Sequence, residues 1–274
     1  MSRLRIFSYL PNPRVWKATI AGRLAGVEVE VRGASPTELQ SWLWDFDARP
    51  LTIADQSSPA DGDLEIGRTG FKGVTLRKTR AFLDAHPFGT VPAAFSPDGT
   101  VGIFESNSIM RAVARLGEKN FPLFGNGAYE ASRVDSFLDV SLVFARDAQT
   151  YLLSLVDGTV SSETHGRARD SLRTYLAGIS RALHSERQFL VGGALTLADI
   201  CFVSEMGLFF NERARRQALE VHALSPILDD ARSDPSYAQA FAHFERLRIH
   251  PAFAPDVGPY LQKLDRAAAG TATA

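Results

Sequence analysis

The sequence predicts two domains, an α/β domain followed by an all-helical domain. The first 31 residues read as a strand, a helix and a second strand. Residues 90–104 hold two short apolar runs separated by Pro-Asp-Gly, which is typical of a β-hairpin. Beyond residue 126, apolar residues recur at spacings of three and four, the period of an amphipathic helix.

Local signals support each N-terminal element. Residues 3–9 (RLRIFSY) alternate and predict a strand. Asn12 followed by Pro13 is a favoured pair for a helix start, so a helix is expected over residues 14–25. Residues 27–31 (VEVEV) alternate strictly and predict a second strand. Because parallel strands need a crossover connection, these two strands are expected to be parallel, and the element order resembles a thioredoxin-like domain.

The least regular stretch spans residues 33–73 and contains two tryptophans and a phenylalanine within SWLWDFD. A long loop inside a compact domain is usually functional or mobile. The aromatic residues suit a lid or a partner surface over a site. They equally suit a loop that packs onto the core. Residues 76–85 are expected to form a short helix.

Composition excludes several classes of function. The chain has 274 residues, of which 45% are hydrophobic and 22% charged, and its net charge is −1. This balance argues against a nucleic-acid partner or a membrane-binding face, and the longest apolar runs are shorter than a membrane span. Cys201 is the only cysteine, so no intramolecular disulfide can form and a cytoplasmic location is expected. The scattered histidines predict no metal site.

The predicted hairpin carries two features that suit a ligand. If the Val91–Pro92 bond is cis, the backbone of Val91 is exposed and can pair with a peptide-like ligand. Ser106 stands at the start of the next helix, where free N–H groups favour an anion. A ligand with a peptide bond and a carboxylate suits both features. The alternative is a hairpin followed by an ordinary serine cap.

Thr90-Val91-Pro92, followed by the residues FESNSI at 104–109, resembles the glutathione site of the glutathione S-transferase superfamily. The resemblance implies that Val91 and Pro92 pair with the cysteinyl part of glutathione. Glutathione itself is expected as a cosubstrate. It implies that Glu105 and Ser106 hold the γ-glutamyl end.

The resemblance extends to the C-terminal half. The phrase FLVGGALTLADI at 189–200 is similar to the buried capping motif of the superfamily's helical domain, with Thr196 and Asp199 at capping-box spacing. These two residues are therefore expected to be structural. The superfamily implies a glutathione transferase fold, with a thioredoxin-like domain at 1–117, an insertion near 35–70, and an all-helical domain at 126–268.

Asn12 occupies the place where the superfamily carries its catalytic Ser, Tyr or Cys. The resemblance implies that its amide donates to the glutathione sulfur and stabilises the thiolate. The alternative is that Asn12 is only a helix cap. Ser8 and Tyr9 are weaker candidates. The glycyl carboxylate is expected to meet a basic residue, and the candidates are Lys72, Arg77, Lys78 and Arg80.

Within the superfamily, Asn12, Arg14, Lys17 and the FESN segment are similar to the transferase-like domain of elongation factor one gamma. An independent, cytosolic, bacterial-type glutathione transferase is the simpler interpretation. Its second substrate is expected to be a hydrophobic, aromatic electrophile, with cleavage of aryl β-ethers as one option. The alternative is a non-catalytic scaffold. Either form is expected as a homodimer or as a heterodimer with a related subunit.

Overall fold

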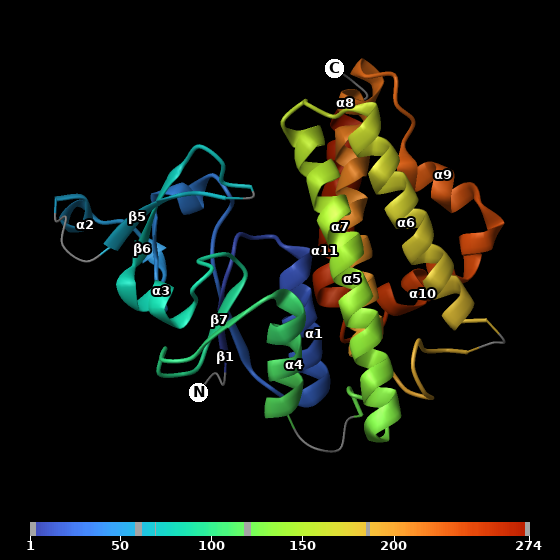
Figure 1. Cartoon of the computed structure of the whole chain (residues 1–274), viewed down its shortest axis with the longest axis horizontal. Coiled ribbons are helices and arrows are strands. Elements are labelled where there is room, and N and C mark those ends of the chain that lie inside the picture. Colours follow the sequence, from blue (N-terminus) through green and yellow to red (C-terminus); the bar gives the residue numbers. More distant parts are fainter. Residues whose placement is uncertain (1–3, 58–61, 69, 118–121, 185–186, 272–274) are drawn as a thin grey trace. The chain divides into compact units, whose positions relative to one another are not determined.

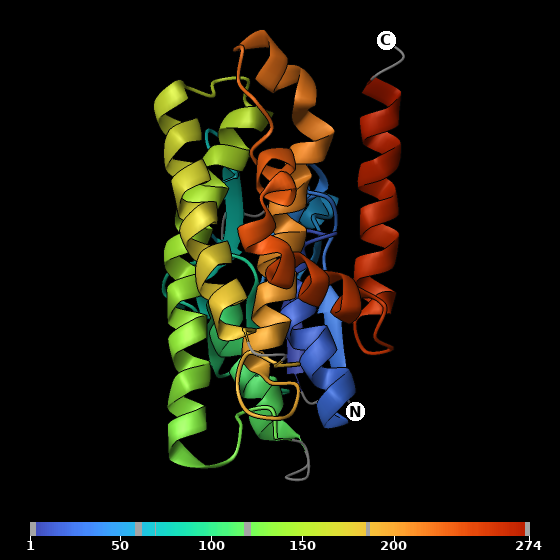
Figure 2. The same cartoon turned by 90° about the vertical axis from the view of Figure 1, so that its right-hand side faces the viewer.

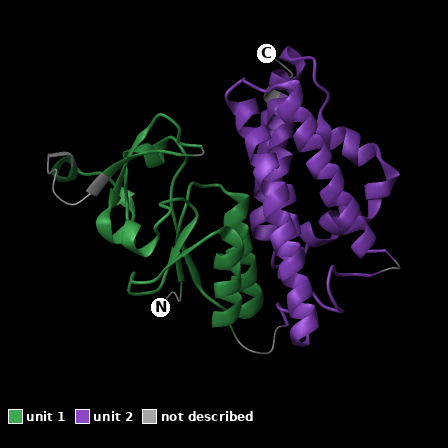
Figure 3. Ribbon diagram, in the orientation of Figure 1, with its two compact units in different colours: residues 1–118 green, residues 119–274 purple. Residues whose placement is uncertain are grey.

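A computed structural model describes residues 4–57, 62–68, 70–117, 122–184 and 187–271. The chain divides into two compact units, Met1–Glu118 and Lys119–Ala274 (Figure 3). The first unit mixes strands and helices and the second is helical (Figure 1). The predicted fold class, a thioredoxin-like α/β domain plus an all-α domain, is confirmed.

The first unit contains a four-stranded sheet, here called sheet A. Its strands, in spatial order, are β2 (Val29–Arg32), β1 (Leu4–Phe7), β7 (Ala93–Phe95) and β8 (Gly102–Phe104). β1 and β2 are parallel, as expected, whereas β7 is antiparallel to both β1 and β8.

Two helices, α1 (Pro13–Ala25) and α4 (Ser106–Leu116), pack side by side in the first unit (Figure 1). α1 ends at Gly26, whose φ of 68° is left-handed and therefore suits a residue without Cβ.

The region expected to be irregular holds a second four-stranded sheet, here called sheet B. Its strands, in spatial order, are β4 (Arg49–Pro50), β3 (Trp42–Trp44), β6 (Thr75–Thr79) and β5 (Gly62–Ile66). Short helical segments accompany it, namely η1 (Glu38–Ser41), α2 (Ile53–Ser57) and α3 (Arg80–Ala85). Residues 58–61 and 69 of the predicted insertion lie outside the described residues.

The prediction of a helix over residues 76–85 is only half correct. Its first part belongs to β6, which pairs along its whole length with β5 in antiparallel register. Leu76 and Lys78 are buried whereas their neighbours along β6 are not, so the strand has the two-residue alternation of a sheet. Pairing with a distant strand therefore decides the structure here.

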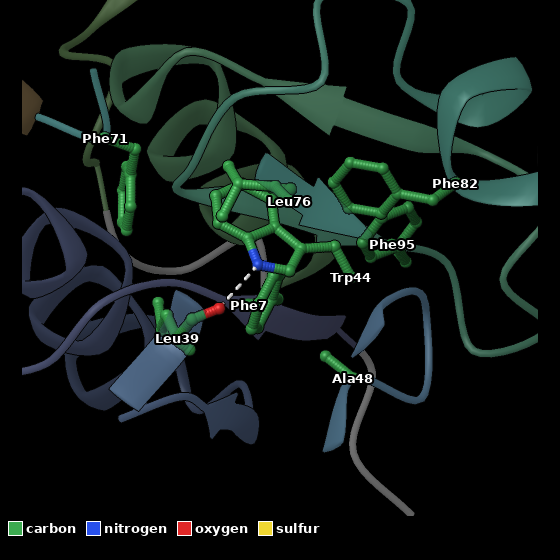
Figure 4. Close-up of a cluster of buried hydrophobic side chains, with 9 residues drawn as sticks. Phe7, Leu39, Trp44, Ala48, Phe71, Leu76, Phe82 and Phe95 are labelled. Atoms are coloured by element: carbon green, nitrogen blue, oxygen red, sulfur yellow. Dashed lines mark hydrogen bonds between the residues drawn. The ribbon is translucent and has the colours of Figure 1, made fainter. Parts of the chain in front are cut away.

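Aromatic side chains from both sheets form one core in the first unit (Figure 4). Trp44 is 1% exposed, and its Nε1 donates to the carbonyl oxygen of Leu39 at 3.1 Å. Phe7 of sheet A and Phe71 meet the Trp44 rings edge-on, with centroids 5.4 and 5.3 Å away. Trp44 is thus a core residue rather than part of a lid, because its ring and its N–H are both satisfied inside.

The second unit consists of helices. These are α5 (Gly127–Val156), α6 (Ser162–Ala182), α7 (Leu197–Phe209), η2 (Phe210–Arg215), α8 (Arg216–Val221), α9 (Ile227–Ser233), η3 (Pro235–Tyr237), α10 (Ala238–Arg248) and α11 (Ala254–Thr271). α5 and α6 run side by side (Figures 1 and 2), and α7 is buried along nearly its whole length. None of the helices among the described residues combines the length and apolarity needed to span a bilayer.

The start of α7 is held by one buried carboxylate. Asp199 accepts hydrogen bonds from the Thr196 N–H at 2.9 Å and the Leu190 N–H at 3.0 Å, and Thr196 and Asp199 complete a capping box. His243 lies 2.9 Å from the same carboxylate, and Arg246 donates to its other ring nitrogen at 2.6 Å. The His243 proton is therefore on Nε2 and points at Asp199.

Candidate functional site

Three chain segments converge at one end of sheet A. The strand register places Phe7 opposite Ala93, and Ala93 opposite Phe104. The residues that emerge next at that end of the three strands are Ser8, Pro92 and Glu105. α1 and α4 both begin there, so two helix N-termini lie close to the same sheet end.

The segment before β7 leaves a backbone edge available at this end. The Val91–Pro92 peptide bond is cis. Val91 precedes the strand ladder, which begins at Ala93. Among the described residues, none of the backbone hydrogen bonds of turns and loops involves Val91. Its side chain packs against the aromatic core, and this packing holds the Val91 backbone in position.

His86 fixes this segment from behind. Its ring is buried, and its Nε2 lies 2.9 Å from the carbonyl oxygen of Thr90. The ring also stacks on Phe104, with centroids 5.0 Å apart and planes 10° apart. Burial lowers the pKa of His86 below its usual range, so the ring is neutral near pH 7 and donates from Nε2 to Thr90.

Glu105 joins β8 to α4 in an unusual backbone conformation. It has φ 65° and ψ 121°, and a positive φ of this kind favours glycine. Such a residue costs about 1–3 kcal/mol, and strain of this kind clusters at ligand sites. Glu105 is exposed, and Ser106 after it is the first residue of α4 and is buried.

A buried lysine stands behind Ser106. Lys17 of α1 is 0% exposed, and its Nζ donates to Ser106 Oγ at 3.2 Å and to Asn107 Oδ1 at 2.7 Å. The sequence motifs do not indicate this role of Lys17. The signal in the sequence is a lysine within a helix start whose neighbours Val15, Trp16 and Ala18 are apolar.

Asn12 is the N-cap of α1 and is 1% exposed. Its Oδ1 accepts from the Arg14 N–H at 2.9 Å, and its amide nitrogen donates to Ser8 Oγ at 3.0 Å. The amide carries a second N–H that remains for another acceptor. Ser8 is itself fully buried, and Tyr9 packs partly against the aromatic core.

The structure gives different surroundings to the four basic residues that are candidates for binding the glycyl carboxylate. Lys78 is buried and its Nζ lies 2.6 Å from a Glu65 oxygen, whereas Arg80 is exposed and pairs with Asp84 at 3.0 Å. Lys72 is exposed and Arg77 is half-buried on sheet B. Lys78 and Arg80 are thus each paired with a carboxylate of the first unit.

The arrangement suits an anionic ligand that contains a peptide bond. The helix starts of α1 and α4 present N–H groups, and neither first turn contains an acidic residue. Lys17 donates a hydrogen bond to Ser106 from within the first unit, and Glu105 is the adjacent carboxylate that can meet a ligand ammonium group.

Comparison with known proteins gives two kinds of relative. No family model matches the chain. A probable elongation factor 1-gamma of Arabidopsis thaliana is 35% identical over 218 residues, which cover 76% of this chain and 41% of that protein. A glutathione S-transferase-like protein, LUC7, of a Fusarium species is 26% identical over 214 residues, or 74% of this chain and 75% of that protein. The chain thus spans less than half the length of the elongation factor relative.

Solved structures of the same fold are more distant in sequence. A glutathione S-transferase of Methylobacterium radiotolerans, in complex with glutathione sulfonate, has a TM-score of 0.59 at 18% identity and covers 93% of this chain and 95% of its own. The glutathione transferase URE2P8 of Phanerochaete chrysosporium, with oxidized glutathione, has a TM-score of 0.61 at 16% identity and covers 97% of this chain and 98% of its own.

The chain therefore has the fold of the glutathione S-transferase superfamily, and the resemblance predicted from its sequence is confirmed. Within that superfamily, its sequence is similar both to elongation factor 1-gamma and to glutathione S-transferase-like proteins.

Proposed function

We propose that this protein binds glutathione at the end of sheet A where Ser8, Pro92 and Glu105 emerge. The observation that carries the proposal is the strand register, which brings the cis Val91–Pro92 segment and the Glu105–Ser106 helix start to one place. The Val91 backbone pairs with the cysteinyl part of glutathione. Ser106 and the start of α4 hold the γ-glutamyl carboxylate, and Glu105 meets the γ-glutamyl ammonium group.

The proposed reaction is transfer of glutathione to a hydrophobic electrophile. Asn12 directs its second amide N–H at the glutathione sulfur, and with the α1 N-terminus it favours the thiolate over the thiol. The thiol proton passes to solvent. The sulfur then forms a bond to an electrophilic carbon, and the leaving group departs with the bonding electrons. Haloarenes and aryl β-ethers are the aromatic electrophiles to screen first.

A second function is supported by a specific observation. The side chain of Asn12 is almost fully buried and already serves as a helix cap and as a donor to Ser8. A protein that binds glutathione without activating it, as a scaffold or a dimer subunit, needs no more than this. The similarity to elongation factor 1-gamma supports this alternative. For either function we propose a cytoplasmic protein that forms a dimer of identical or related subunits. Light scattering measures the dimer directly.

One experiment separates the two functions. Glutathione binding is measured by calorimetry, and the thiolate absorbance of the bound ligand is then followed against pH. A free thiol has a pKa of about 8.5, and an enzyme is expected to lower the pKa of the bound thiol by at least about one unit. Binding with an unchanged thiol pKa supports the scaffold, and no binding contradicts both functions.

Asn12→Asp tests the residue itself. An aspartate oxygen still accepts from the Arg14 N–H and caps α1, but it offers no N–H to the sulfur. If Asn12 is catalytic, this variant still folds and binds glutathione but loses the low thiol pKa. Asn126→Ala, at the N-cap of α5, is the matched control, because Asn126 makes no side-chain capping hydrogen bond.

A further inference from the structure

Strand β5 forms one edge of sheet B, because the spatial order of the strands is β4, β3, β6 and β5. It pairs with β6 along Gly62–Ile66 and has no second partner strand among the described residues. An edge strand presents a row of backbone N–H and C=O groups with which another extended chain can pair. Sheet B can therefore be extended at β5 by one more strand.

The outer face of this edge is apolar. Glu65 lies opposite the buried Leu76 in the register of β5 and β6, so both belong to the face that covers the aromatic core. Leu64 and Ile66 belong to the opposite face, because successive residues of a strand alternate between the two faces. Leu64 is 64% exposed and Ile66 is 75% exposed. Two exposed apolar side chains on an edge strand mark an interaction surface.

The turn that joins β5 to β6 is tight and anchored. The Gly67 N–H donates to the carbonyl oxygen of Val74 at 2.7 Å, and a Cβ at Gly67 would lie 2.1 Å from the carbonyl oxygen of Phe71. Phe71 is buried and meets the ring of Trp44 edge-on. The turn is therefore fixed to the aromatic core, and the side chains that it exposes are held next to the end of β5.

This turn is also basic. Residues 66–83 contain five lysines and arginines and no acidic residue, although the net charge of the whole chain is −1. Lys78 and Arg80 are paired with carboxylates, whereas Arg68 and Lys72, in the turn itself, are exposed. A chain that pairs with β5 thus meets apolar side chains along the strand and positive charge at the end of the strand. The complementary partner is apolar along its length and acidic at that end.

We propose that β5 and the turn at 67–74 bind an extended, acidic segment of a partner protein, which adds a fifth strand to sheet B. The segment runs antiparallel to β5, the more stable of the two pairings, so its acidic N-terminal end meets Arg68. Every second residue of the segment is apolar and packs beside Leu64 and Ile66. The residues between them are neutral, because they share a face with Glu65. The proposal does not depend on glutathione binding.

A dye-labelled peptide, Glu-Glu-Val-Thr-Val-Thr-Val, tests the proposal by fluorescence anisotropy with the full chain. It is expected to bind with a Kd of about 100 µM or tighter. Its counterpart with two lysines in place of the glutamates is expected to bind at least about tenfold more weakly, because like charges meet at the turn. Glu-Glu-Val-Val-Val-Thr-Thr has the same composition without the alternation and is expected to bind at least about threefold more weakly. Equal affinities of the three peptides, or no binding of the first, overturn the proposal.

Two variants locate the binding. Leu64→Asp is expected to weaken binding of the first peptide by about tenfold or more, whereas Val101→Asp, a change at another exposed apolar residue of the first unit, leaves it within about twofold. Arg68→Gln is expected to weaken it by about twofold to fivefold, the effect of one exposed charge, and Arg23→Gln is the matched control at an exposed arginine of α1. Equal affinities of Leu64→Asp and Val101→Asp overturn the proposal. A dimer that dissociates in Leu64→Asp, measured by light scattering, would show that a second copy occupies this edge and would overturn it as well.

Discussion

The imidazole of His86 donates to the carbonyl oxygen of Thr90, with Nε2 and the oxygen 2.9 Å apart. Thr90 immediately precedes Val91. The same ring stacks on Phe104, which immediately precedes Glu105. One buried side chain therefore contacts both segments of the proposed glutathione site, although these segments lie on different sides of the hairpin.

His86→Phe is expected to weaken glutathione binding by about threefold to tenfold, because the ring stack is retained and the hydrogen bond to Thr90 is lost. The carbonyl of Thr90 then lacks its donor, and the Val91 backbone is positioned less firmly. Calorimetry with glutathione measures the effect. His222→Phe is the matched control, since His222 is an exposed histidine that also contacts a carbonyl oxygen, that of Gly158 at 3.3 Å. Equal affinities of His86→Phe and the control contradict the positioning role.

The buried state of His86 also predicts a pH dependence of stability. Burial lowers the pKa of His86 in the folded state below the ordinary value of 6.5. The unfolded chain therefore takes up this proton first as the pH falls. The contribution to the free energy of unfolding is complete above that ordinary value and is lost as the pH falls toward the lower pKa of the folded state, by at most about 1.4 kcal/mol per pH unit.

Urea unfolding of the wild type and His86→Phe between neutral and mildly acidic pH isolates this contribution. The difference between the two proteins is the relevant quantity, because other groups titrate as well. Burial raises the pKa of Glu212, so that carboxyl group contributes stability that is lost in the opposite direction, as the pH rises. Parallel pH profiles of the two proteins would show that His86 does not titrate as described.

Asp199→Asn is expected to destabilise the second unit by about 3 kcal/mol or more. The carboxylate accepts from the N–H groups of Leu190 and Thr196 and lies against His243 Nε2. An asparagine replaces one acceptor oxygen by an amide group, so buried donors face a donor, and each costs about 1–3 kcal/mol. Urea unfolding of the full chain measures the loss.

A matched aspartate gives the control for that variant. Asp234 caps η3 by accepting from the Ser236 N–H at 2.9 Å, but it is only half-buried. Asp234→Asn is expected to cost no more than about 1 kcal/mol, since water and the amide oxygen replace the lost acceptor. Similar losses for the two variants would mean that the buried carboxylate has no special role in folding.

The parts of this fold that the sequence predicts are those marked by local signals. Asn12-Pro13 marks the start of α1, and the Pro-Asp-Gly turn marks the β7–β8 hairpin, because capping and turn chemistry depend on neighbouring residues. Sheet B was missed because its pairings are distant. β3 joins β6 through Leu43 and Arg77, which lie far apart in the chain, and a short apolar run does not reveal such a partner.

The candidate site also combines residues that a local motif predicts with residues whose roles depend on distant contacts. Val91, Pro92, Glu105 and Ser106 are predicted from two short motifs, at 90–92 and 104–109, and they remain the proposed contacts. Lys17 and His86 act from behind the motif, and their roles depend on burial and on contacts with residues of other elements. The residue types alone do not indicate these roles, since a lysine in a helix is usually exposed and a histidine in a turn is usually solvated.

The most direct test of the central claim is a calorimetric titration of the wild type, Ser106→Ala and Ser108→Ala with glutathione. Ser106 and Ser108 both lie in the first turn of α4, but only Ser106 is bonded to Lys17. The proposed site predicts binding by the wild type, a loss of about tenfold or more in Ser106→Ala, and a change within about twofold in Ser108→Ala. No binding by the wild type, or equal affinities of all three proteins, would contradict a glutathione site at this end of sheet A.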